Sequence, residues 1–586
     1  MNLIQFLKQV DQSVSRLSKN ELGAFIHETA RTLPEYQRDM FLGKLNAMGK
    51  RKPEELSASP ISDFGTEALR QKITQLEQEL TQIEDGQLCP VGYLNEEYDD
   101  WYDSSADEFL FEDPENVTDR LSEACRLIHQ CVDQELYPEG FRLFAQLARL
   151  TITITGDYEE YCDPEMSFYD FIDAVHLDIC QKDLVLDGLY LAYQAVPMPQ
   201  RPEMLFAIIQ EACCRDITLE ALMQKGENDL PEWDTFLTQW IEYLGRQNNS
   251  LSKKLLSEAA SLQDSPEQFL ESARKFADLH PEMYEQYLRQ GLNGQEDAKM
   301  LATGQEALHT ISPQFTIRSQ AALLTATYAL RLNKRETAEN CWLEAFRSDT
   351  NEVNYLRLRL ESLDFSLYQE ETNQIICAAH KTMETPYAFV SDSSGKNRIA
   401  SNTYYGLVFF NGNFRQVIQE AMNTKDALGW SSTFMKYGLA LFLPYLYSGD
   451  SLENGCRAMC QSAAEYSNFR SESYRAGLSR PTEPDDGQLF WQCFSRWKKT
   501  VSISSEEAEQ IIQKLQDMIT MRVKGIMESN RRNYYGECAA FIAALGEAKE
   551  SRGERNGKAK LMEYYRTMYS RRRAFHEELR KFGMRK

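Results

Sequence analysis

Apolar side chains recur at helical spacing along most of this chain. One stripe, for example, contains Leu121, Ala124, Ile128 and Val132. Steps of three and four residues place such side chains on one face of a helix. Short turns separate successive stripes, as at 137–140, and no long β-branched alternation indicates a sheet. The pattern predicts an all-α protein whose helices come in pairs from 118 to 500.

The hydrophobic pattern also divides the N-terminal part of the chain. Ser18 and Glu21 have the spacing of a helix capping box, which predicts a small N-terminal helical module over 1–49. Residues 50–64 contain prolines and serines and are typical of a linker. A helix is predicted over 65–85, and the C-terminal helices over 501–586 form a predicted cap.

The helix predicted over 65–85 carries a narrow apolar seam, formed by Leu69, Ile73, Leu76, Leu80 and Ile83. Alternating steps of four and three over two heptads are typical of a short coiled coil. Two interpretations stay open. The helix docks on a neighbour in the same chain, or two copies of the protein associate through residues 65–85.

Residues 86–117 form an acidic segment with interleaved aromatic residues. Between positions 84 and 119 there are thirteen Asp or Glu and no Lys or Arg. Charge repulsion favours an extended chain there, while the aromatic side chains can be buried against a partner. The candidate partner-binding residues are Tyr98, Trp101, Tyr102, Phe109 and Phe111. The alternative is a surface loop wrapped on the protein itself.

One helix pair has a specific residue pattern. Ala326, Ala338, Trp342 and Ala345 stand at small, small, aromatic and small positions. Small residues let two helices approach closely, and the aromatic residue fills the gap to the next pair. This pattern resembles a degenerate tetratricopeptide repeat, with further weak copies over 401–463. The resemblance implies an α-solenoid of tetratricopeptide-like helix pairs, lying between the N-terminal module and the C-terminal cap.

The charge of the chain is distributed unevenly. The formal net charge is −25, which argues against nucleic acid coating the whole surface. The end is basic, however, since residues 552–586 hold 12 Lys or Arg and 4 Asp or Glu. The candidate nucleic-acid-binding residues are Arg566, Arg571, Arg572, Arg573, Arg580 and Lys581. A solvated helix face, or a clasp on the acidic segment, explains the same charges.

The C-terminal helices resemble a known family. The similar stretches are Arg531-Arg532-Asn533-Tyr534-Tyr535-Gly536-Glu537-Cys538-Ala539, Ala543-Ala544-Leu545-Gly546-Glu547 and Tyr569-Ser570-Arg571-Arg572-Arg573-Ala574-Phe575. They are similar to the closing helices of bacterial SWIM zinc-finger proteins. The resemblance implies a helical-repeat region associated with nucleic-acid or protein binding. The chain has no Cys-x-Cys followed by Cys-x-His, so the zinc-dependent binding of that family does not carry over.

Motifs for catalysis are missing from the sequence. It has no phosphate-binding loop, nucleophile elbow or His-Glu-x-x-His helix, and only seven histidines. One set of four residues has zinc-ligand chemistry and helical spacing: Cys125, His129, His176 and Cys180. The competing interpretation is packing, because cysteines are commonly buried for that reason alone.

The cysteine pattern and the apolar segments indicate the compartment. The thirteen cysteines contain no Cys-x-x-Cys motif, which favours free thiols in a reducing cytoplasm. No apolar stretch is long enough to cross a membrane. We therefore expect a non-enzymatic scaffold or adaptor that needs no cofactor and binds a protein or peptide. The alternative is a nucleic-acid-associated factor that uses the basic C-terminal helices.

Overall fold

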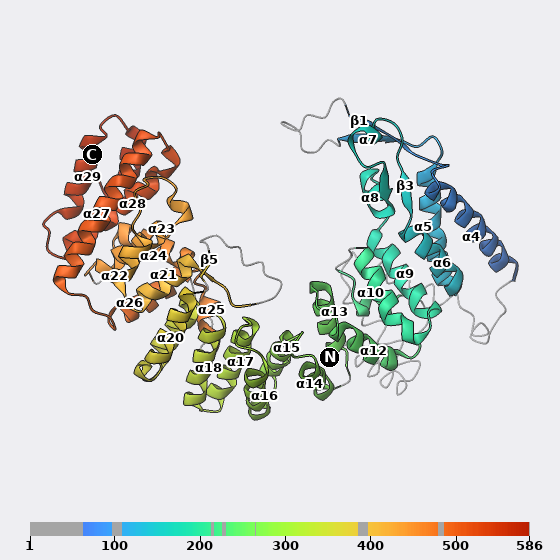
Figure 1. The fold of residues 1–586 in the computed structure, drawn as a ribbon, viewed down its shortest axis with the longest axis horizontal. Helices are drawn as coiled ribbons and strands as arrows, with labels where there is room; N and C mark the ends of the chain where they lie inside the picture. Colours follow the sequence, from blue (N-terminus) through green and yellow to red (C-terminus); the bar gives the residue numbers. More distant parts are fainter. Residues whose placement is uncertain are drawn as a thin grey trace, which may run out of the picture. The chain divides into compact units, whose positions relative to one another are not determined.

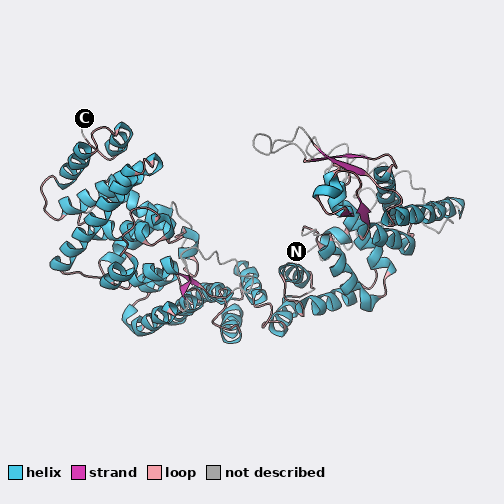
Figure 2. Ribbon diagram, turned by 45° about the horizontal axis from the view of Figure 1, so that its top comes forward, coloured by secondary structure: helices cyan, strands magenta, loops and turns pink. Residues whose placement is uncertain are grey.

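The structure is a computed structural model that describes residues 63–95, 108–212, 216–225, 230–263, 265–381, 383–384, 396–449, 451–478 and 486–584. Helices dominate these residues (Figures 1 and 2), which confirms the all-α prediction. The predicted N-terminal module and most of the linker lie outside the described residues. Two compact units, 1–272 and 273–586, divide the chain, and each is described by itself.

The first unit is built from short helices that pack on their sequence neighbours. Its helices are α4 (Asp63–Glu84), α5 (Val117–Asp133), α6 (Tyr137–Ala148), α7 (Tyr158–Tyr161), α8 (Phe168–Ala174), α9 (Gln181–Ala195), the 3-10 helix η2 (Met198–Gln200), α10 (Arg201–Glu211), α11 (Leu219–Met223), α12 (Trp233–Gly245), α13 (Ser250–Ser261) and the start of α14 (Pro266–Lys275). Helices α5, α6 and α9 contact one another, and α10 packs on α9 and α12.

Helix α4 buries its apolar seam within the same unit. The five seam residues are at most 8% exposed, and α4 packs on α5, α6 and a short strand. Ion pairs flank the contact, with Arg142 Nε 2.6 Å from Glu77 Oε1 and Arg120 Nε 3.1 Å from Glu79 Oε2. The seam is therefore already covered by its own chain, as in the docked-helix interpretation.

Short strands accompany the helices of the first unit. The pairs are antiparallel: β1 (Val91–Leu94) with β2 (Phe109–Glu112), and β3 (Thr151–Thr153) with β4 (Glu165–Ser167). These strands give no signal in the sequence, because segments of three or four residues are too short for a clear alternating pattern. They connect helices and form no sheet core.

The second unit contains the remaining helices of the described chain. They are the end of α14, α15 (Glu282–Gln290), η3 (Gly291–Asn293), α16 (Asp297–Thr310), α17 (Ile317–Arg331), α18 (Arg335–Ser348), α19 (Glu352–Glu361), η4 (Phe365–Leu367), α20 (Gln369–His380), α21 (Ser401–Phe410), α22 (Phe414–Gln416), the π-helix η5 (Val417–Ala421), η6 (Trp430–Ser432), α23 (Met435–Leu446), α24 (Asn454–Tyr466), α25 (Ser471–Arg475), α26 (Asp486–Lys498), α27 (Ser505–Glu528), η7 (Arg532–Tyr534), α28 (Tyr535–Ser551), α29 (Gly557–Met568) and α30 (Arg573–Lys581). Strands β5 (Met383–Glu384) and β6 (Ile399–Ala400) pair in parallel.

Helices α17 and α18 form the pair that the small-residue pattern predicts. Asn333, with φ of 56°, makes the tight turn between them. Ala326, Ala338 and Ala345 are fully buried, so the two helices approach closely. Helix α16 packs on α17 and α19 on α18, and Figure 1 shows α16, α17 and α18 following one another along the chain.

The chain then returns to cover this pair. Trp342 is fully buried, but its indole Nε1 donates to the carbonyl oxygen of Gly477 at 2.9 Å. Arg357 on α19 donates to the carbonyl oxygen of Tyr474 at 2.9 Å. Helices α25 and α26 thus pack on α19. Helices α18 and α19 are thus packed against a segment that lies more than 100 residues later in the sequence. In an ideal one-dimensional repeat array, each repeat would contact only its sequence neighbours.

Helix α28 is the central element of the C-terminal helices. It packs on α23, α24, α27, α29 and α30. Gly455 on α24 leaves room for this contact, because a Cβ there would lie 2.4 Å from the backbone nitrogen of Ala544. The buried Glu547 accepts hydrogen bonds from the backbone N–H groups of Gly455 and Cys456 at 2.9 and 2.7 Å. Its carboxylate therefore caps the N-terminus of α24.

None of the described helices combines the length and the apolar character that a transmembrane segment needs.

Candidate functional site

A polar groove lies on the second unit, where α20, α21, α22 and η5 meet. Its volume is about 530 Å³, within the range of ligand sites in proteins. Helix α20 contacts α21, which contacts α22 and η5, and Figure 1 shows α20, α21 and α22 near one another. The lining residues are Gln369, Asn373, Ile376, Cys377, His380, Tyr404, Val408, Asn411, Asn413, Gln416 and Glu420. We call this site the α20–η5 groove.

Side-chain amides form an oriented relay in the α20–η5 groove. The hydroxyl of Tyr355 donates to Asn411 Oδ1 at 3.2 Å, and Asn411 Nδ2 donates to Asn373 Oδ1 at 2.9 Å. Because the oxygen of Asn373 is the acceptor, its NH₂ group is left to donate. The relay starts at a fully buried tyrosine and therefore fixes which face of the Asn373 amide meets the groove.

A second group of polar atoms lies at the other side of the groove. Gln416 Nε2 donates to the hydroxyl oxygen of Tyr404 at 3.3 Å and to Glu420 Oε2 at 3.1 Å. The Tyr404 ring is buried, and the ring of His380 lies 5.1 Å from it between centroids. Burial, followed by the nearby Glu420 carboxylate, raises the pKa of the Tyr404 hydroxyl. Tyr404 therefore keeps its proton at neutral pH.

Glu420 lies on a π-helical turn. The N–H of Met422 donates to the carbonyl oxygen of Val417 at 3.1 Å, which is the five-residue spacing of a π-helix. A π-turn is a rare element that is found frequently at functional sites. Here the turn follows α22 directly and carries the groove's carboxylate.

The α20–η5 groove has the chemistry of a binding site. Its lining, as far as the structure describes it, holds one carboxylate, one imidazole and several amides, and neither Lys nor Arg. Cys377 and His380 both line it, yet no hydrogen bond joins them in the described part of the chain. A nucleophile with a hydrogen-bonded base is the usual sign of covalent catalysis. The amides and the carboxylate offer hydrogen-bond donors and acceptors to a polar ligand.

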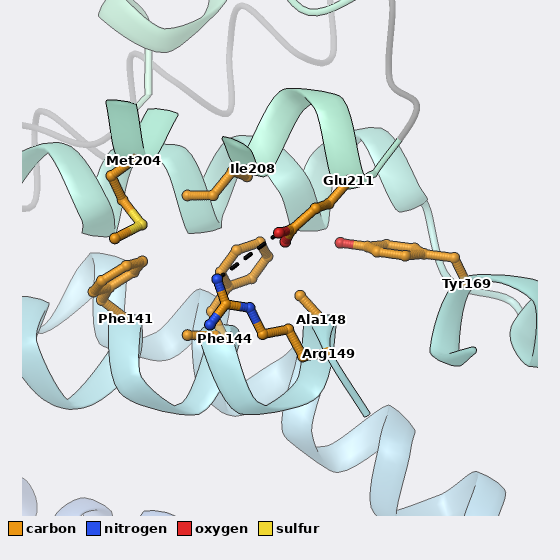
Figure 3. Close-up of a pocket in the computed structure, with 9 residues that line it drawn as sticks. Phe141, Phe144, Ala148, Arg149, Tyr169, Met204, Ile208 and Glu211 are labelled. Carbon is orange, nitrogen blue, oxygen red and sulfur yellow. Dashed lines mark ion pairs between the residues drawn. The ribbon is translucent and has the colours of Figure 1, made fainter. Parts of the chain in front are cut away.

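A small apolar hollow in the first unit lies between α6 and α10, with Tyr169 of α8 at its side (Figure 3). Its volume is about 20 Å³, room for about one water molecule. Arg149 Nη2 lies 3.8 Å from Glu211 Oε1 near the Phe144 ring, and both charged side chains are about half-exposed. Such an exposed pair contributes little stability, so the hollow is an interhelical packing gap.

Two larger hollows are less defined. One of about 520 Å³ lies beside α10 and α12 in the first unit. Another of about 830 Å³ lies between α24 and α26. Its lining includes Gly487, which follows closely on residues that the structure does not describe. Neither contains an oriented amide relay like that of Asn411 and Asn373.

The structure describes only part of the predicted acidic aromatic segment. Tyr98, Trp101 and Tyr102 lie outside the described residues. Phe109 and Phe111 lie on β2, half-buried, and their ring centroids are 4.9 and 6.0 Å from that of Tyr158. These two aromatic residues therefore pack on their own unit, which matches the self-wrapped alternative at these positions.

The basic C-terminal residues divide into two groups. Arg566 and Lys581 form ion pairs of 2.7 Å with Glu563 and Glu578, and Arg572 Nη2 donates to the carbonyl oxygen of Met527 at 2.9 Å. The second group consists of Arg571, Arg573 and Arg580, which are exposed and face no carboxylate partner among the described residues.

The structure does not bring the four candidate zinc ligands together. Within the described ranges, no three His, Cys, Asp or Glu side chains converge as a metal site. Cys125 and His129 lie on α5, where His129 Nδ1 is 3.1 Å from Asp187 Oδ2. The expectation that His176 and Cys180 share a helix is wrong. His176 has φ of 51° in the turn after α8, and Cys180 precedes α9.

Sequence reasoning missed the α20–η5 groove. The helical face of α20 mixes Gln369, Asn373 and Cys377 with one apolar residue, which looks like an ordinary solvated surface. The opposite wall comes from a segment that begins more than 20 residues later and contains an unexpected π-turn. The signal was a cluster of amides at positions 411, 413 and 416 directly after the aromatic stretch of α21.

Comparison with known proteins adds no assignment. No protein-family model matches the chain. A search of curated proteins also found no match.

Proposed function

We propose that this protein is a non-enzymatic helical-repeat scaffold that binds a protein or peptide partner in the α20–η5 groove. The oriented amides of Asn373 and Asn411 are the observation that carries the proposal. Amide side chains combine donors and acceptors, and they bind main-chain groups without carrying out a reaction. The α17–α18 pair supports the view that the protein contains tetratricopeptide-like repeats of an α-solenoid, which commonly present concave binding surfaces.

A cytoplasmic location belongs to the same proposal. The cysteines in the described part of the chain are free thiols. A reducing compartment keeps them so.

Photo-crosslinking from the groove tests the proposal. Cys377 is exposed and lines the groove. It can carry a benzophenone in a variant with the other exposed or half-buried cysteines, and Cys213 and Cys214, replaced by serine; the exposed and half-buried ones are Cys89, Cys125, Cys162 and Cys180. A lysate of the source organism should yield one defined crosslinked protein. A benzophenone on Cys180, with Cys377 replaced, is the matched control because Cys180 is also exposed but lies in the first unit.

Substitutions in the groove complete this test. Gln369→Ala with Asn413→Ala removes two exposed lining amides, whereas Gln374→Ala removes an exposed amide of α20 outside the lining. The crosslink should be lost with the double variant and kept with the control. Equal crosslinking from positions 377 and 180, or no loss in the double variant, would refute binding in the groove.

Nucleic-acid binding is the second candidate function. The guanidinium groups of Arg571, Arg573 and Arg580 favour it, because they are exposed, have no carboxylate partner in the described part of the chain, and phosphate contacts need such groups. Replacing all three with glutamine should weaken oligonucleotide binding and lower the salt slope by about 2 to 3. The control replaces Arg566 and Lys581, which already pair with carboxylates. Equal weak binding by both variants and the parent would refute this candidate.

A further inference from the structure

We infer that the α20–η5 groove binds an extended peptide segment whose Lys or Arg side chain pairs with Glu420. The inference rests on the proposed function and narrows the partner class. It combines three observations: the unsatisfied amide groups, the spacing of the polar face of α20, and the sign of the charge in the groove.

The polar atoms left open in the groove match a peptide main chain. The NH₂ group of Asn373 has no acceptor among the described residues, since only its oxygen is engaged by Asn411. Gln416 uses its NH₂ group on Tyr404 and Glu420, which leaves its carbonyl oxygen to accept. The wall formed by α20 thus offers the N–H donors of Asn373, and the opposite wall offers the side-chain carbonyl oxygen of Gln416 as an acceptor. A peptide group has one C=O and one N–H, and it can satisfy both walls.

The spacing along α20 fits an extended chain. Gln369, Asn373 and Cys377 follow one another at steps of four, and they all line the groove. Four residues of an α-helix rise about 6 Å. Two residues of an extended chain rise about 6.6 Å. Successive turns of α20 therefore face every second residue of an extended peptide over two to three turns.

The charge of the groove selects a basic side chain. Glu420 is exposed, and within the described chain its carboxylate contacts Gln416 through a neutral amide. Among the described residues, the lining contains no Lys or Arg that would neutralise it. An acidic segment would meet Glu420 with like charge and is disfavoured.

A small organic ligand fits these observations less well. Sites for such ligands are mostly apolar, with a few polar groups that fix orientation. Here the five amides and the Glu420 carboxylate of the described lining outnumber its aliphatic side chains, which are Ile376 and Val408.

A displayed library of random dodecapeptides tests the inference. Selection on the full-length protein should enrich peptides with a Lys or Arg at a fixed position. Synthetic copies of the enriched peptides are then measured by fluorescence anisotropy. Glu420→Gln should weaken their affinity roughly five- to tenfold. Glu370→Gln is the matched control, because Glu370 is exposed on α20 but absent from the lining, and its effect should stay within about twofold. Circular dichroism confirms that both variants are folded.

The outcomes separate the inference from the proposed function. Enriched peptides without a basic position, or a basic peptide that loses equal affinity in both variants, would overturn the inference. The same holds if the library yields no binder, or if acidic peptides are enriched. In these cases, crosslinking of a cellular protein from Cys377 would leave the proposed function standing. If the peptide selection and the crosslinking from Cys377 both fail, the inference and the proposed function are both wrong.

Discussion

The indole nitrogen of Trp342 donates a 2.9 Å hydrogen bond to the carbonyl oxygen of Gly477, 135 residues further along the chain. The tryptophan belongs to α18, while Gly477 follows α25 and adopts φ of 75°. A Cβ at Gly477 would lie 3.0 Å from Leu323 Cδ2. Close approach of the returning chain therefore depends on both residues.

We expect Trp342→Phe to lower the free energy of unfolding of the second unit by roughly 2 to 3 kcal/mol. Phenylalanine leaves the Gly477 oxygen without its donor and fills less volume. Hydrogen exchange should accelerate together in α17–α18 and in residues 471–478. The first unit should keep its exchange pattern. Trp491→Phe, at a half-buried tryptophan, is the control and should cost less than about 1 kcal/mol. Acceleration confined to α18 would contradict the coupling.

The same contact shows what the sequence could and could not predict. The α17–α18 pair was predictable, because Ala326, Ala338 and Ala345 lie on two helices that follow one another directly in the sequence. Their spacing therefore reflects only local packing. The partner of Trp342 was not, since nothing in a helical stripe states which distant segment covers it. The segment around Gly477 contains little apolar sequence and gave no signal of burial.

The candidate site was less predictable than the fold. Asn373 and Asn411 are separated by 38 positions, and a polar residue on a helix is usually a solvated one. Only the packing of α20 on α21 brings these two amides within hydrogen-bond distance. The prediction of a zinc site was wrong for a related reason. The four-residue spacing of His176 and Cys180 predicts that both lie on one helix, but the chain makes a turn at His176.

Glu547 should be essential for the packing of α24 on α28. Its carboxylate is 1% exposed, accepts two backbone hydrogen bonds and lies 2.6 Å from Lys558 Nζ. Removing it leaves the first turn of α24 uncapped and a largely buried ammonium group without its closest partner. We expect Glu547→Ala to cost about 3 to 5 kcal/mol and Glu547→Gln about 1 to 3 kcal/mol.

Chemical denaturation measures these losses. Exchange of the first backbone amides of α24 measures the cap directly. Glu453→Gln serves as control, because Glu453 is half-exposed and 3.3 Å from the same Lys558 Nζ. A cost for the control as large as that of Glu547→Gln would show that the ion pair, rather than the cap, stabilises the contact.

Glu352 should make the second unit less stable at alkaline pH. Burial raises the pKa of its carboxyl from 4.5 to about 8, despite a 3.1 Å hydrogen bond from the hydroxyl of Tyr437. Between these two values the folded protein holds a proton that the unfolded chain releases, so stability falls as the pH rises. The loss contributed by this group between pH 5 and pH 8 is roughly 3 to 4 kcal/mol.

Glu352→Gln removes this titration while keeping an acceptor for Tyr437. The variant should match the parent near pH 5 and exceed its stability near pH 8, as measured by urea unfolding at each pH. Glu370→Gln, at an exposed position of α20, should follow the parent at both values. An unchanged pH dependence in Glu352→Gln would assign the alkaline loss to other groups.

Thiol reactivity should distinguish Cys377 from the buried cysteines. Cys377 and Cys180 are exposed, whereas Cys341 and Cys538 are buried. Burial raises the pKa of both buried thiols to about 12. Because the thiolate is the nucleophile, a raised pKa and lack of access both slow alkylation. N-ethylmaleimide at pH 7 should therefore modify Cys377 and Cys180 well before Cys341 and Cys538, as mapped by peptide mass spectrometry.

A bound peptide sharpens this prediction. A ligand in the α20–η5 groove covers Cys377 and leaves Cys180 in the first unit untouched. A selected dodecapeptide at saturation should slow the alkylation of Cys377 about tenfold or more, while Cys180 reacts at its original rate. In Glu420→Gln, the same peptide concentration should protect Cys377 less, because the affinity is lower. Equal protection of both cysteines would indicate a general change in the protein, and protection of Cys180 alone would move the binding surface to the first unit.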